Sequence, residues 1–461
     1  MPPESIGGNA PRGGSGRDAR GGSSTHSAVT DARVAAADLC ADLRAGDLLD
    51  QAFERCAGRL DARDRRWTQE LVWGMLRRRA ALDVIVDDRV KGGIARLDPD
   101  VIDLLRLGVQ QLLHMGSVPA YAAIAQTVEL AKRRHGKGAS GLVNAVLRRT
   151  DRERDSLGSA TPTDPIDALA LAHSHPRWLV ARWVARWGAD ETATLLAANN
   201  VQGPVTVRPY GIVSEQLEAT LESAGVEIHD APLARGSIAL GLGVALTELG
   251  AFKQGLFFVQ DPAATLVTQY ASIATGAIVA DLCAAPGGKS LELSRTASLV
   301  IAADKSEGRV RRLADNLHRV DATNVQVIAA DARALPLGTV DAVLLDVPCS
   351  GTGTFRRHPD ARWRLKVSDL AVTAASQRAL VRAAAGHVRV GGLLVYSTCS
   401  LEPEENDEQV ERFLAEHPAW QLEPPPEGVV PAEVLDAGRL RVLPQRHGTD
   451  GAFAARLRRT A

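Results

Sequence analysis

The chain has 461 residues, of which 45% are hydrophobic and 4% aromatic, and its formal net charge is −1 at pH 7. This length suffices for about three domains, and the near-zero charge excludes a global attraction for nucleic acid, which leaves only local basic patches. The five cysteines have neither CxxC nor zinc-ligand spacing, a pattern typical of reduced thiols in a cytosolic protein. No apolar run approaches a membrane span or signal region, so we expect a cytoplasmic protein without a membrane or metal partner.

The front of the chain divides into a polar tail and a helical region. Residues 1–30 are rich in Gly, Ser, Pro and Arg, which predicts a disordered tail. Apolar residues at three- and four-residue spacing then predict helices over 32–46, 48–58, 64–88, 98–115, 119–134 and 138–150. Asp64, Asp98 and Pro119 are start signals, and Gly116 and Gly136 are stop signals.

Three clusters of basic residues lie within these predicted helices. They are 77–79, 132–134 and 148–149. Each cluster alone is more typical of a solvated helix end, where positive charge suits the helix dipole. Because three of them occur on one bundle, a face that contacts nucleic-acid phosphates is also plausible.

A linker and a small mixed module are predicted next. Residues 151–165 are polar, contain two prolines and predict a linker. An amphipathic helix is predicted over 175–188; its Trp178, Trp183 and Trp187 favour core packing, with base stacking as the alternative. Short apolar segments around a polar helix, from 205 to 261, indicate a small α+β module.

A nucleoside-cofactor site is predicted in the following segment. A strand over 278–282 leads into a Pro-Gly-Gly turn at 286–288 and then a helix. Glycines allow close backbone approach, and a helix N-terminus favours a carboxylate or phosphate. The next strand, 299–303, ends in Asp304, which is placed to bind ribose hydroxyls, and a third, 325–329, leads into Asp331. Since the turn lacks the GxGxxG form, a dinucleotide is not the first choice.

Two further predicted strands each end in a polar turn that contains a cysteine. The strand over 342–345 ends at Asp346 and is followed by Cys349; the strand over 393–397 is followed by Cys399. A single strand-end cysteine is more often a small buried hydrophobe. Ligands in open α/β sheets bind at the carboxyl ends of strands, and both cysteines lie in polar turns, so the pair favours a thiol site.

These motifs together resemble a known family. DLCAAPGGK (281–289), DVPCSGTG (346–353) and YSTCS (396–400) occur in this order, as in the S-adenosylmethionine-dependent RNA cytosine-5 methyltransferases of the Nop/Sun family. The bacterial Sun (Fmu) group, which acts on small-subunit (16S) ribosomal RNA, is the nearest match. The resemblance covers about 30–460. Ser290 and Val347 depart from the expected threonine and alanine, and neither change removes a reactive group.

The resemblance implies an α/β fold in three parts. A Rossmann-like S-adenosylmethionine methyltransferase domain over 259–461 follows an all-α NusB-like RNA-binding domain over 31–150 and a small α+β linking module over 166–258. The segment 446–459 is expected to form a turn and the final strand of the sheet. The expected partner is 16S rRNA, either alone or within a partly assembled ribosomal subunit.

The resemblance also implies a role for individual residues. Cys399 is the nucleophile that attacks cytosine C6, Cys349 is the second thiol, and Asp346 stabilises the ring and borders the cofactor. Asp304 would hold the ribose and Asp331 the adenine side. The methionine part would contact Cys283, Ala284, Ala285, Pro286, Gly287, Gly288 and Lys289.

Further residues receive smaller roles or none. Asp281 is expected to support the cofactor loop, and Cys283 to act through its backbone. The basic triplet 356–358 is expected to grip RNA, with a helix end or a local salt network as the alternative. Acids at 402, 404 and 405 are expected to begin a helix without a catalytic part. Alternatives for the whole protein are tRNA or 23S rRNA as substrate, or an RNA-binding assembly factor with a vestigial methyltransferase domain.

Overall fold

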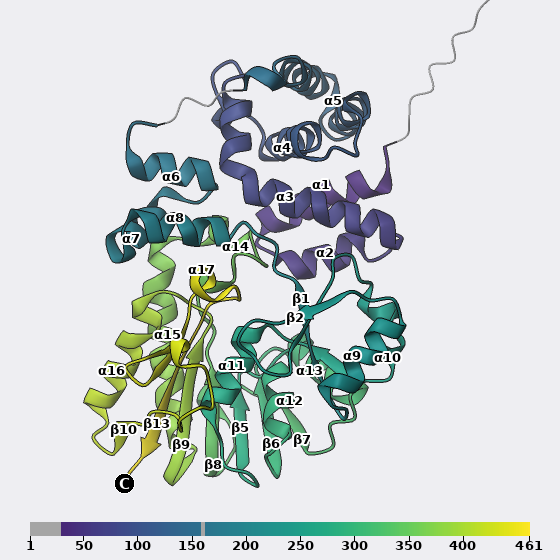
Figure 1. Ribbon diagram of the computed structural model, residues 1–461. Helices are drawn as coiled ribbons and strands as arrows, with labels where there is room; N and C mark the ends of the chain where they lie inside the picture. The colour runs from purple at the N-terminus through teal and green to yellow at the C-terminus, as the bar shows by residue number, and fades with distance from the viewer. Residues whose placement is uncertain (1–28, 158–161) are drawn as a thin grey trace, which may run out of the picture.

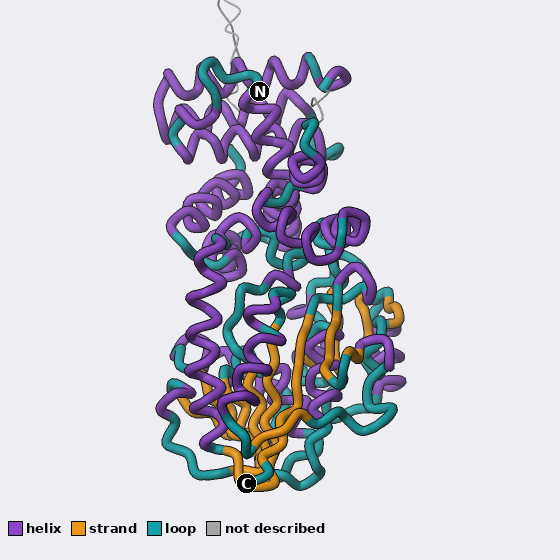
Figure 2. Tube along the Cα trace, turned by 90° about the vertical axis from the view of Figure 1, so that its left-hand side faces the viewer, coloured by secondary structure: helices purple, strands orange, loops and turns teal. Residues whose placement is uncertain are grey.

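The computed structural model describes residues 29–157 and 162–461. The predicted disordered tail therefore falls outside the described residues, apart from its last two positions. Figure 1 shows a helical bundle above a large twisted sheet, with a second, smaller sheet beside it. Figure 2 shows the same division into a helix-only part and a strand-rich part. The predicted α/β fold, preceded by an all-α region and a small α+β module, is confirmed.

The helical bundle buries one continuous apolar core that includes Leu39, Leu71 and Leu105. Its helices are α1 (Asp31–Ala45), α2 (Leu49–Ala57), α3 (Ala62–Asp87), α4 (Pro99–His114) and α5 (Ala120–Arg152). The predicted start at Asp64 is wrong by two residues, because Asp61 caps α3 and accepts a hydrogen bond from the Asp64 N–H at 2.9 Å. The predicted break at Gly136 is confirmed by its φ of 79° inside α5.

Part of the predicted linker is ordered structure. Helix α5 continues to Arg152, a short turn follows over Arg154–Ser156, and α6 begins at Pro165. Residues 158–161 lie outside the described part of the chain. The proposed domain boundaries at 150, 165 and 258 stay predictions.

A three-helix layer and a four-stranded sheet connect the bundle to the large sheet. The helices are α6 (Pro165–His173), α7 (Arg177–Trp187) and α8 (Ala189–Ala198). Trp183 is fully buried among them, and Trp178 and Trp187 pack against the same core, which confirms core packing. The antiparallel sheet has the order β2-β3-β1-β4, formed by β1 (Val205–Pro209), β2 (Ile228–Asp230), β3 (Ile238–Leu240) and β4 (Phe257–Val259); α9 (Ser214–Ser223) and α10 (Gly250–Lys253) accompany it.

The large sheet has the order β11-β12-β13-β9-β8-β5-β6-β7, with β10 paired to β13. Five strands are parallel: β5 (Ile278–Leu282), β6 (Leu299–Asp304), β7 (Val325–Ala329), β8 (Val340–Asp346) and β9 (Val388–Thr398). The closing strands are antiparallel: β10 (Trp420–Leu422), β11 (Leu435–Asp436), β12 (Arg439–Val442) and β13 (Ala452–Arg459). The predicted final strand is thereby confirmed.

Helices cover both faces of the parallel strands, as near-continuous apolar runs require. One face packs on α11 (Pro262–Ala271) and the other on α15 (Val367–Gly386) and α16 (Asp407–Glu416). The remaining helices are α12 (Gly288–Ser294), α13 (Glu307–Arg319), α14 (Ala361–Arg364) and α17 (Pro444–His447). Within the described residues, no helix combines the length and apolarity needed to cross a bilayer.

Candidate active site

The two strand-end cysteines meet at the carboxyl edge of adjacent parallel strands. Asp346 at the end of β8 pairs in register with Ser397 of β9, so the turns that follow both strands leave the sheet side by side. The Sγ atoms of Cys349 and Cys399 are 3.2 Å apart, and both cysteines are free thiols. The Gly353 N–H also donates to the Cys399 carbonyl at 3.0 Å. The two turns therefore form one thiol pair.

A buried carboxylate, which the sequence analysis did not single out as part of the site, connects the two cysteine turns. Glu405 accepts the Ser350 N–H at 2.9 Å and the Ser350 hydroxyl, and the amide of Gln377 donates to it at 3.2 Å. The Ser350 hydroxyl lies 3.1 Å from that of Ser400. Since each serine follows one of the cysteines, Glu405 anchors the turn of Cys349 and, through the serine pair, that of Cys399.

The acids at 402, 404 and 405 begin a helix as expected, because Glu402 is the N-cap residue of the short 3-10 helix Pro403–Glu405, which α16 follows from Asp407. Glu405 nevertheless has no exposed surface. Glu402 is also buried and accepts the indole N–H of Trp183 at 3.0 Å. Burial raises the pKa of Glu405 above its ordinary value. No pattern in the local sequence separates these buried acids from solvated ones; only the fold around them does.

The two thiols of the pair have different electrostatic environments. The hydrogen bond with Cys399 and burial raise the pKa of Cys349 well above its ordinary value, and the Glu405 carboxyl adds to this effect. A thiol with a raised pKa keeps its proton. Cys349 is therefore suited to donating a hydrogen bond to a thiolate on Cys399, and to handling protons itself.

Asp346 lies beside the thiol pair and is held at both oxygens. Lys289 donates to Oδ2 at 2.8 Å, and the Ser397 hydroxyl donates to Oδ1 at 2.9 Å. Burial alone would lower the pKa of Lys289. The surrounding acids, Asp346 foremost, raise the pKa by more, so that the pKa of Lys289 lies above its ordinary value. This ion pair joins the predicted cofactor loop to the predicted catalytic edge. The Lys289 ammonium group therefore binds Asp346, in addition to its predicted contact with the cofactor.

The predicted cofactor loop, residues 283–289, is a tight turn between β5 and α12. Gly287 has φ of 107°, where a Cβ atom would lie 2.5 Å from Leu313. Cys283 has φ of 65°, which is unusual for a residue with a side chain. From α13, Arg309 donates to the carbonyl of Ala285 at 2.8 Å. The loop is thus held in a single conformation with its backbone close to the sheet edge.

Asp281 and Cys283 lie at the start of the predicted cofactor loop. The Ser290 hydroxyl of α12 donates to Oδ2 of Asp281 in β5 at 2.5 Å, so this bond connects the two elements that flank the loop. Burial raises the pKa of Asp281 to about 7. Burial likewise raises the pKa of the Cys283 thiol to about 12, which makes it unreactive at neutral pH.

A pocket of about 130 Å³ opens between this loop and the thiol turn. Cys283, Asp304 and Asp331 line it together with Pro348, the residue before Cys349. Other predicted cofactor residues, Ala284 to Lys289 and Asp346, border the same edge without lining this pocket. The lining of this pocket thus runs from Asp304, the predicted ribose ligand, to Pro348 beside Cys349.

The polar groups of the pocket fit an S-adenosyl cofactor. Oδ2 of Asp304 is buried without a hydrogen bond; Arg309 lies 3.2 Å away but not in hydrogen-bonding geometry. A buried carboxylate oxygen without a donor costs free energy that ribose hydroxyls would offset. Asp331 is instead satisfied by Arg333, which lowers its pKa to about 2. Among the described residues no cluster of His, Cys, Asp and Glu could hold a metal ion.

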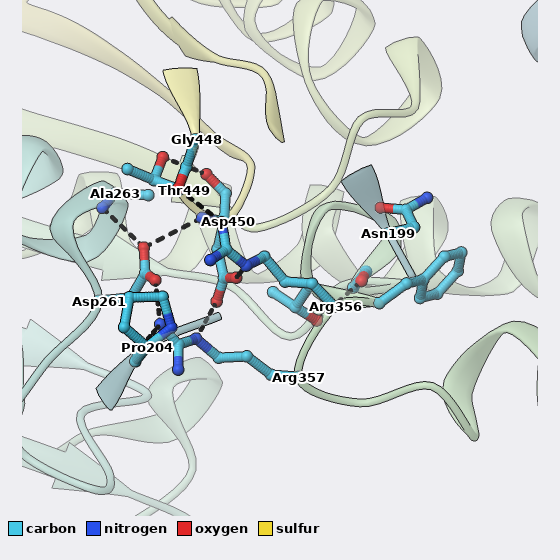
Figure 3. Close-up of polar contacts among 12 residues, drawn as sticks. Asn199, Pro204, Asp261, Ala263, Arg356, Arg357, Gly448, Thr449 and Asp450 are labelled. Carbon is cyan, nitrogen blue, oxygen red and sulfur yellow. Dashed lines mark hydrogen bonds and ion pairs between the residues drawn. The ribbon is translucent and has the colours of Figure 1, made fainter. Parts of the chain in front are cut away.

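Arg356 and Arg357, expected to contact RNA and to order the substrate loop, lie in a local salt network, which was the alternative. Figure 3 shows both guanidinium groups directed at Asp450. Arg357 donates to Asp450 at 3.0 Å and to Asp261 at 2.5 Å, and Arg356 donates to the Gly448 carbonyl at 2.6 Å. Burial and the neighbouring Asp261 raise the pKa of Asp450 to about 7. These arginines hold the segment after the thiol turn; Arg356 is buried and Arg357 is 24% exposed.

The helical bundle contacts this same segment, chiefly through α3. From α3, the Trp73 indole donates to the Arg357 carbonyl at 3.1 Å, and Arg77 donates to the Arg356 carbonyl at 3.0 Å. Arg77 is thus occupied at the contact between the bundle and the catalytic part. It belongs to one of the three basic clusters predicted to contact RNA, so that cluster has in part a structural role.

His358 and the basic clusters 132–134 and 148–149 stay candidates for RNA contact. Lys132 and Arg133 are about half exposed, at 48% and 51% of the side chain. Arg149 pairs with Glu153 at 2.9 Å, which agrees with the alternative of a solvated helix end. His358 is 41% exposed and 3.6 Å from Asp50 of the bundle.

Family models match all three parts of the chain. Residues 272–458 match the model described as 16S rRNA methyltransferase RsmB/F, residues 30–152 match the NusB family, and residues 175–247 match the RsmF/B-like ferredoxin-like domain. The Rossmann-like, NusB-like and small α+β parts are thereby each matched to a described family.

Similar proteins cover nearly the whole chain. "Probable ribosomal RNA small subunit methyltransferase B" of Synechocystis is 35% identical over 89% of this chain and 94% of its own. Ribosomal RNA small subunit methyltransferase B of Pseudomonas syringae is 34% identical over 92% and 96%. The crystal structure of PH0851 has a TM-score of 0.80 and 25% identity, and covers 93% of this chain and 98% of its own.

Proposed function

The chain belongs to the RsmB/F family of 16S rRNA methyltransferases, and we propose that it methylates C5 of a cytosine in 16S rRNA with S-adenosylmethionine as methyl donor. The observation that carries the proposal is the thiol pair, Cys349 and Cys399, 3.2 Å apart beside Asp346. Cytosine C5 is a weak nucleophile, and the addition of a thiolate to C6 activates it. The second thiol can take part in the proton transfer that the later steps require.

The Cys399 thiolate adds to C6 of the cytosine. The electron pair of the C5–C6 double bond is then available at C5, which forms a bond to the incoming methyl group. When bound, the cofactor supplies that methyl group as an electrophile on a positively charged sulfur, which keeps the bonding pair. Asp346, fixed by Lys289 and Ser397, would hold the polar edge of the ring.

Cys349 takes part in the later steps. A base removes the proton from C5, the electron pair re-forms the C5–C6 double bond, and the bond from C6 to Cys399 Sγ breaks. Cys349, whose pKa is raised by its hydrogen bond with Cys399 and by burial, keeps its proton and would deliver it to the Cys399 sulfur as the bond to C6 breaks.

The cofactor would lie along the pocket between the loop 283–289 and Pro348. Asp304 would accept hydrogen bonds from the ribose hydroxyls through Oδ2, which accepts no hydrogen bond from the protein. Asp331 lines the adenine end of the same pocket. Gly287 and Gly288 allow the backbone to approach the methionine part.

The two thiols are separated by two variants. Cys399→Ser should abolish methylation, because a serine hydroxyl is scarcely ionised near neutral pH. Cys349→Ala should permit attack and methyl transfer but block elimination, which leaves the protein covalently attached to its RNA. That adduct should survive denaturing electrophoresis and disappear in the double variant. Cys56→Ala, a change at the partly buried cysteine of α2, is the matched control and should behave as wild type.

The opposite pattern would contradict the assignment. Adducts in the Cys399 variant and none in the Cys349 variant would make Cys349 the nucleophile. Bisulfite sequencing of 16S rRNA from cells with and without the protein identifies the modified cytosine. Radiolabelled methyl transfer to total RNA, followed by sizing, tests the substrate: label in tRNA or 23S rRNA would replace the 16S assignment, and no label in any RNA despite tight RNA binding would favour an assembly factor.

A further inference from the structure

We propose that a second pocket, between the helical bundle and the segment 360–364, binds one nucleotide of the RNA strand, with Arg79 and Arg364 as phosphate ligands. This interdomain pocket is separate from the cofactor pocket and shares none of its lining residues. The inference rests on the proposed function in one respect, that the ligand is RNA.

The pocket has a volume of about 300 Å³. Its walls come from α1, α3 and α4 on one side and from the segment around α14 on the other. Leu43, Met75 and Ile102 supply apolar surface. The charged lining consists of four arginines, 44, 79, 106 and 364, and two aspartates, 103 and 360, so the arginines are in excess. Sites for small ligands have this character and occur preferentially where domains meet, and the volume is at the lower end of their range. A single base with its phosphate is a ligand of the corresponding size and chemistry.

Two arginines of the pocket already have carboxylate partners. Arg106 is bound by Asp83, at 2.6 and 2.8 Å, and by Asp103 at 2.8 Å. Arg44 donates to Asp100 at 2.8 Å and to Asp103. Arg44 and Arg106 therefore form an ion-pair network with these aspartates. They are part of the wall of the pocket, and we do not assign them to the ligand.

Arg79 and Arg364 differ from Arg44 and Arg106, because most of their N–H donors have no hydrogen-bond acceptor in the protein. Among the described residues Arg79 makes no hydrogen bond; its nearest carboxylate, Asp83, is 3.9 Å away, and its guanidinium lies 5.1 Å from the centre of the Trp363 ring. Arg364 bonds Asp360 through Nε alone, at 3.0 Å. Both side chains are about one third exposed, at 33% and 37%, so the N–H groups that Asp83 and Asp360 do not occupy are accessible to a ligand. Burial of the rest of the side chain lowers the pKa of Arg79. A phosphate oxygen is the acceptor that guanidinium groups bind best.

The position of the pocket favours RNA over a free anion. Trp363, at its edge, donates to the Leu76 carbonyl at 2.8 Å, so the pocket lies where the bundle contacts the catalytic part. Its catalytic-side wall belongs to the chain that follows the Cys349 turn. Figure 1 shows α14 between α3 and the large sheet. An RNA strand with its target base at the thiols would thus have a neighbouring nucleotide site on the same side of the molecule.

The test is filter binding of in vitro transcribed 16S rRNA to the full-length protein, without methyl transfer. The double variant Arg79→Gln/Arg364→Gln should weaken binding by about tenfold or more, since each lost charge-assisted hydrogen bond is a large effect. The slope of log affinity against log salt should also fall by about 1. Arg78→Gln is the matched control: Arg78 donates to Gly74 of its own helix and does not line the pocket.

A second variant tests the pocket itself and leaves both arginines unchanged. Leu43→Trp narrows the cavity from a partly exposed position and should also weaken RNA binding about tenfold. Cofactor affinity and the unfolding midpoint should match wild type in all variants, which separates a lost RNA site from a lost fold.

Three results would overturn the inference. The first is wild-type RNA affinity in the double variant. The second is a loss of RNA affinity in Arg78→Gln equal to that in the double variant. The third is a double variant that no longer binds inorganic phosphate but retains its RNA affinity. The last would indicate a site for a free anion only. Because binding is measured without catalysis, a protein that methylates no RNA yet binds through this pocket refutes the proposed function alone. Normal methylation with no role for the pocket refutes this inference alone.

Discussion

The cofactor loop, residues 283–289, and the segment 355–364 border the same edge of the large sheet, yet different contacts hold them. The loop is held mainly from within its own β-α-β unit: Ser290 bonds Asp281 across 9 positions, and Arg309 bonds the Ala285 carbonyl across 24. Lys289 is the exception, because it bonds Asp346 across 57 positions. The segment is held from distant parts of the chain: Trp363 bonds Leu76 across 287 positions.

This difference decides what a sequence motif can reveal. A loop held mainly by partners within 30 positions carries its conformation in a recognisable local pattern of strand, glycine turn and acid. A segment whose partners are scattered over the chain carries no such pattern, and its basic residues look like surface residues. The following predictions compare the two regions, from the largest expected effect to the smallest.

Arg362 is the centre of the segment and should be the most sensitive position for stability. It is fully buried and donates to the Asn199 carbonyl at 3.0 Å and the Asn200 side chain at 2.8 Å. Arg362→Met would leave these acceptors buried and unpaired, at a cost of about 3 kcal/mol of unfolding free energy. Urea unfolding measures it. Arg364→Met, on the same short helix but more exposed, should cost under about 1 kcal/mol; equal losses would show that Arg362 has no special role.

Asp304 tests the cofactor site, and the quantity measured is the affinity for S-adenosylmethionine and not the free energy of unfolding. Hydrogen bonds from ribose to this charged acceptor are worth about 1.5–3 kcal/mol, so Asp304→Ala should weaken S-adenosylmethionine binding by roughly 10–100-fold. Calorimetry measures the affinity, and the unfolding midpoint should stay near wild type. Asp315→Ala, at an exposed position on α13, should have no effect. Unchanged affinity in the Asp304 variant would remove this residue from the cofactor site.

Asp281 predicts a pH dependence for the loop. Its pKa is raised to about 7 in the folded protein, mainly by burial, from an ordinary value of 3.8. The folded state therefore holds a proton that the unfolded state has released, and stability falls as pH rises toward 7. Between pH 5 and pH 8 the free energy of unfolding should decrease by about 2 kcal/mol through this group.

Asp281→Asn provides the control for that prediction. Asparagine does not titrate and still offers an oxygen to the Ser290 hydroxyl, so the variant should lose this part of the pH slope. Identical slopes in the two proteins would assign the pH dependence to other groups, of which Asp450 is the nearest equivalent.

Trp73 should give the smallest effect, because it supplies one neutral hydrogen bond to the segment. Trp73→Phe removes the indole N–H that donates to the Arg357 carbonyl at 3.1 Å and retains an aromatic ring. The expected loss is about 1 kcal/mol of unfolding free energy, with faster proteolytic cleavage within 355–364 and unchanged cleavage of the cofactor loop. Equal acceleration at both places would show that the two regions are not held independently.

The sequence alone determined the parallel strands and what stands at their ends. The strands at 278–282 and 325–329 were predicted with the bounds that the structure has. Asp304, Cys349 and Cys399 were predicted at the carboxyl edge, where the structure has them. Apolar runs and turn residues are local signals, and parallel strands bring their ends to one edge whatever the rest of the chain does.

Tertiary structure alone decided which polar groups are buried. Glu405 and Glu404 are neighbours in the same acidic run, yet only Glu405 is enclosed beneath the cysteine turns. In the sequence, Arg356 and Arg357 resemble an exposed basic patch. In the structure, Asp450 and Asp261, from remote segments of the chain, form ion pairs there. The physical reason is that burial and ion pairing depend on which distant segments pack against a residue, and nothing in its own neighbourhood of the sequence records that.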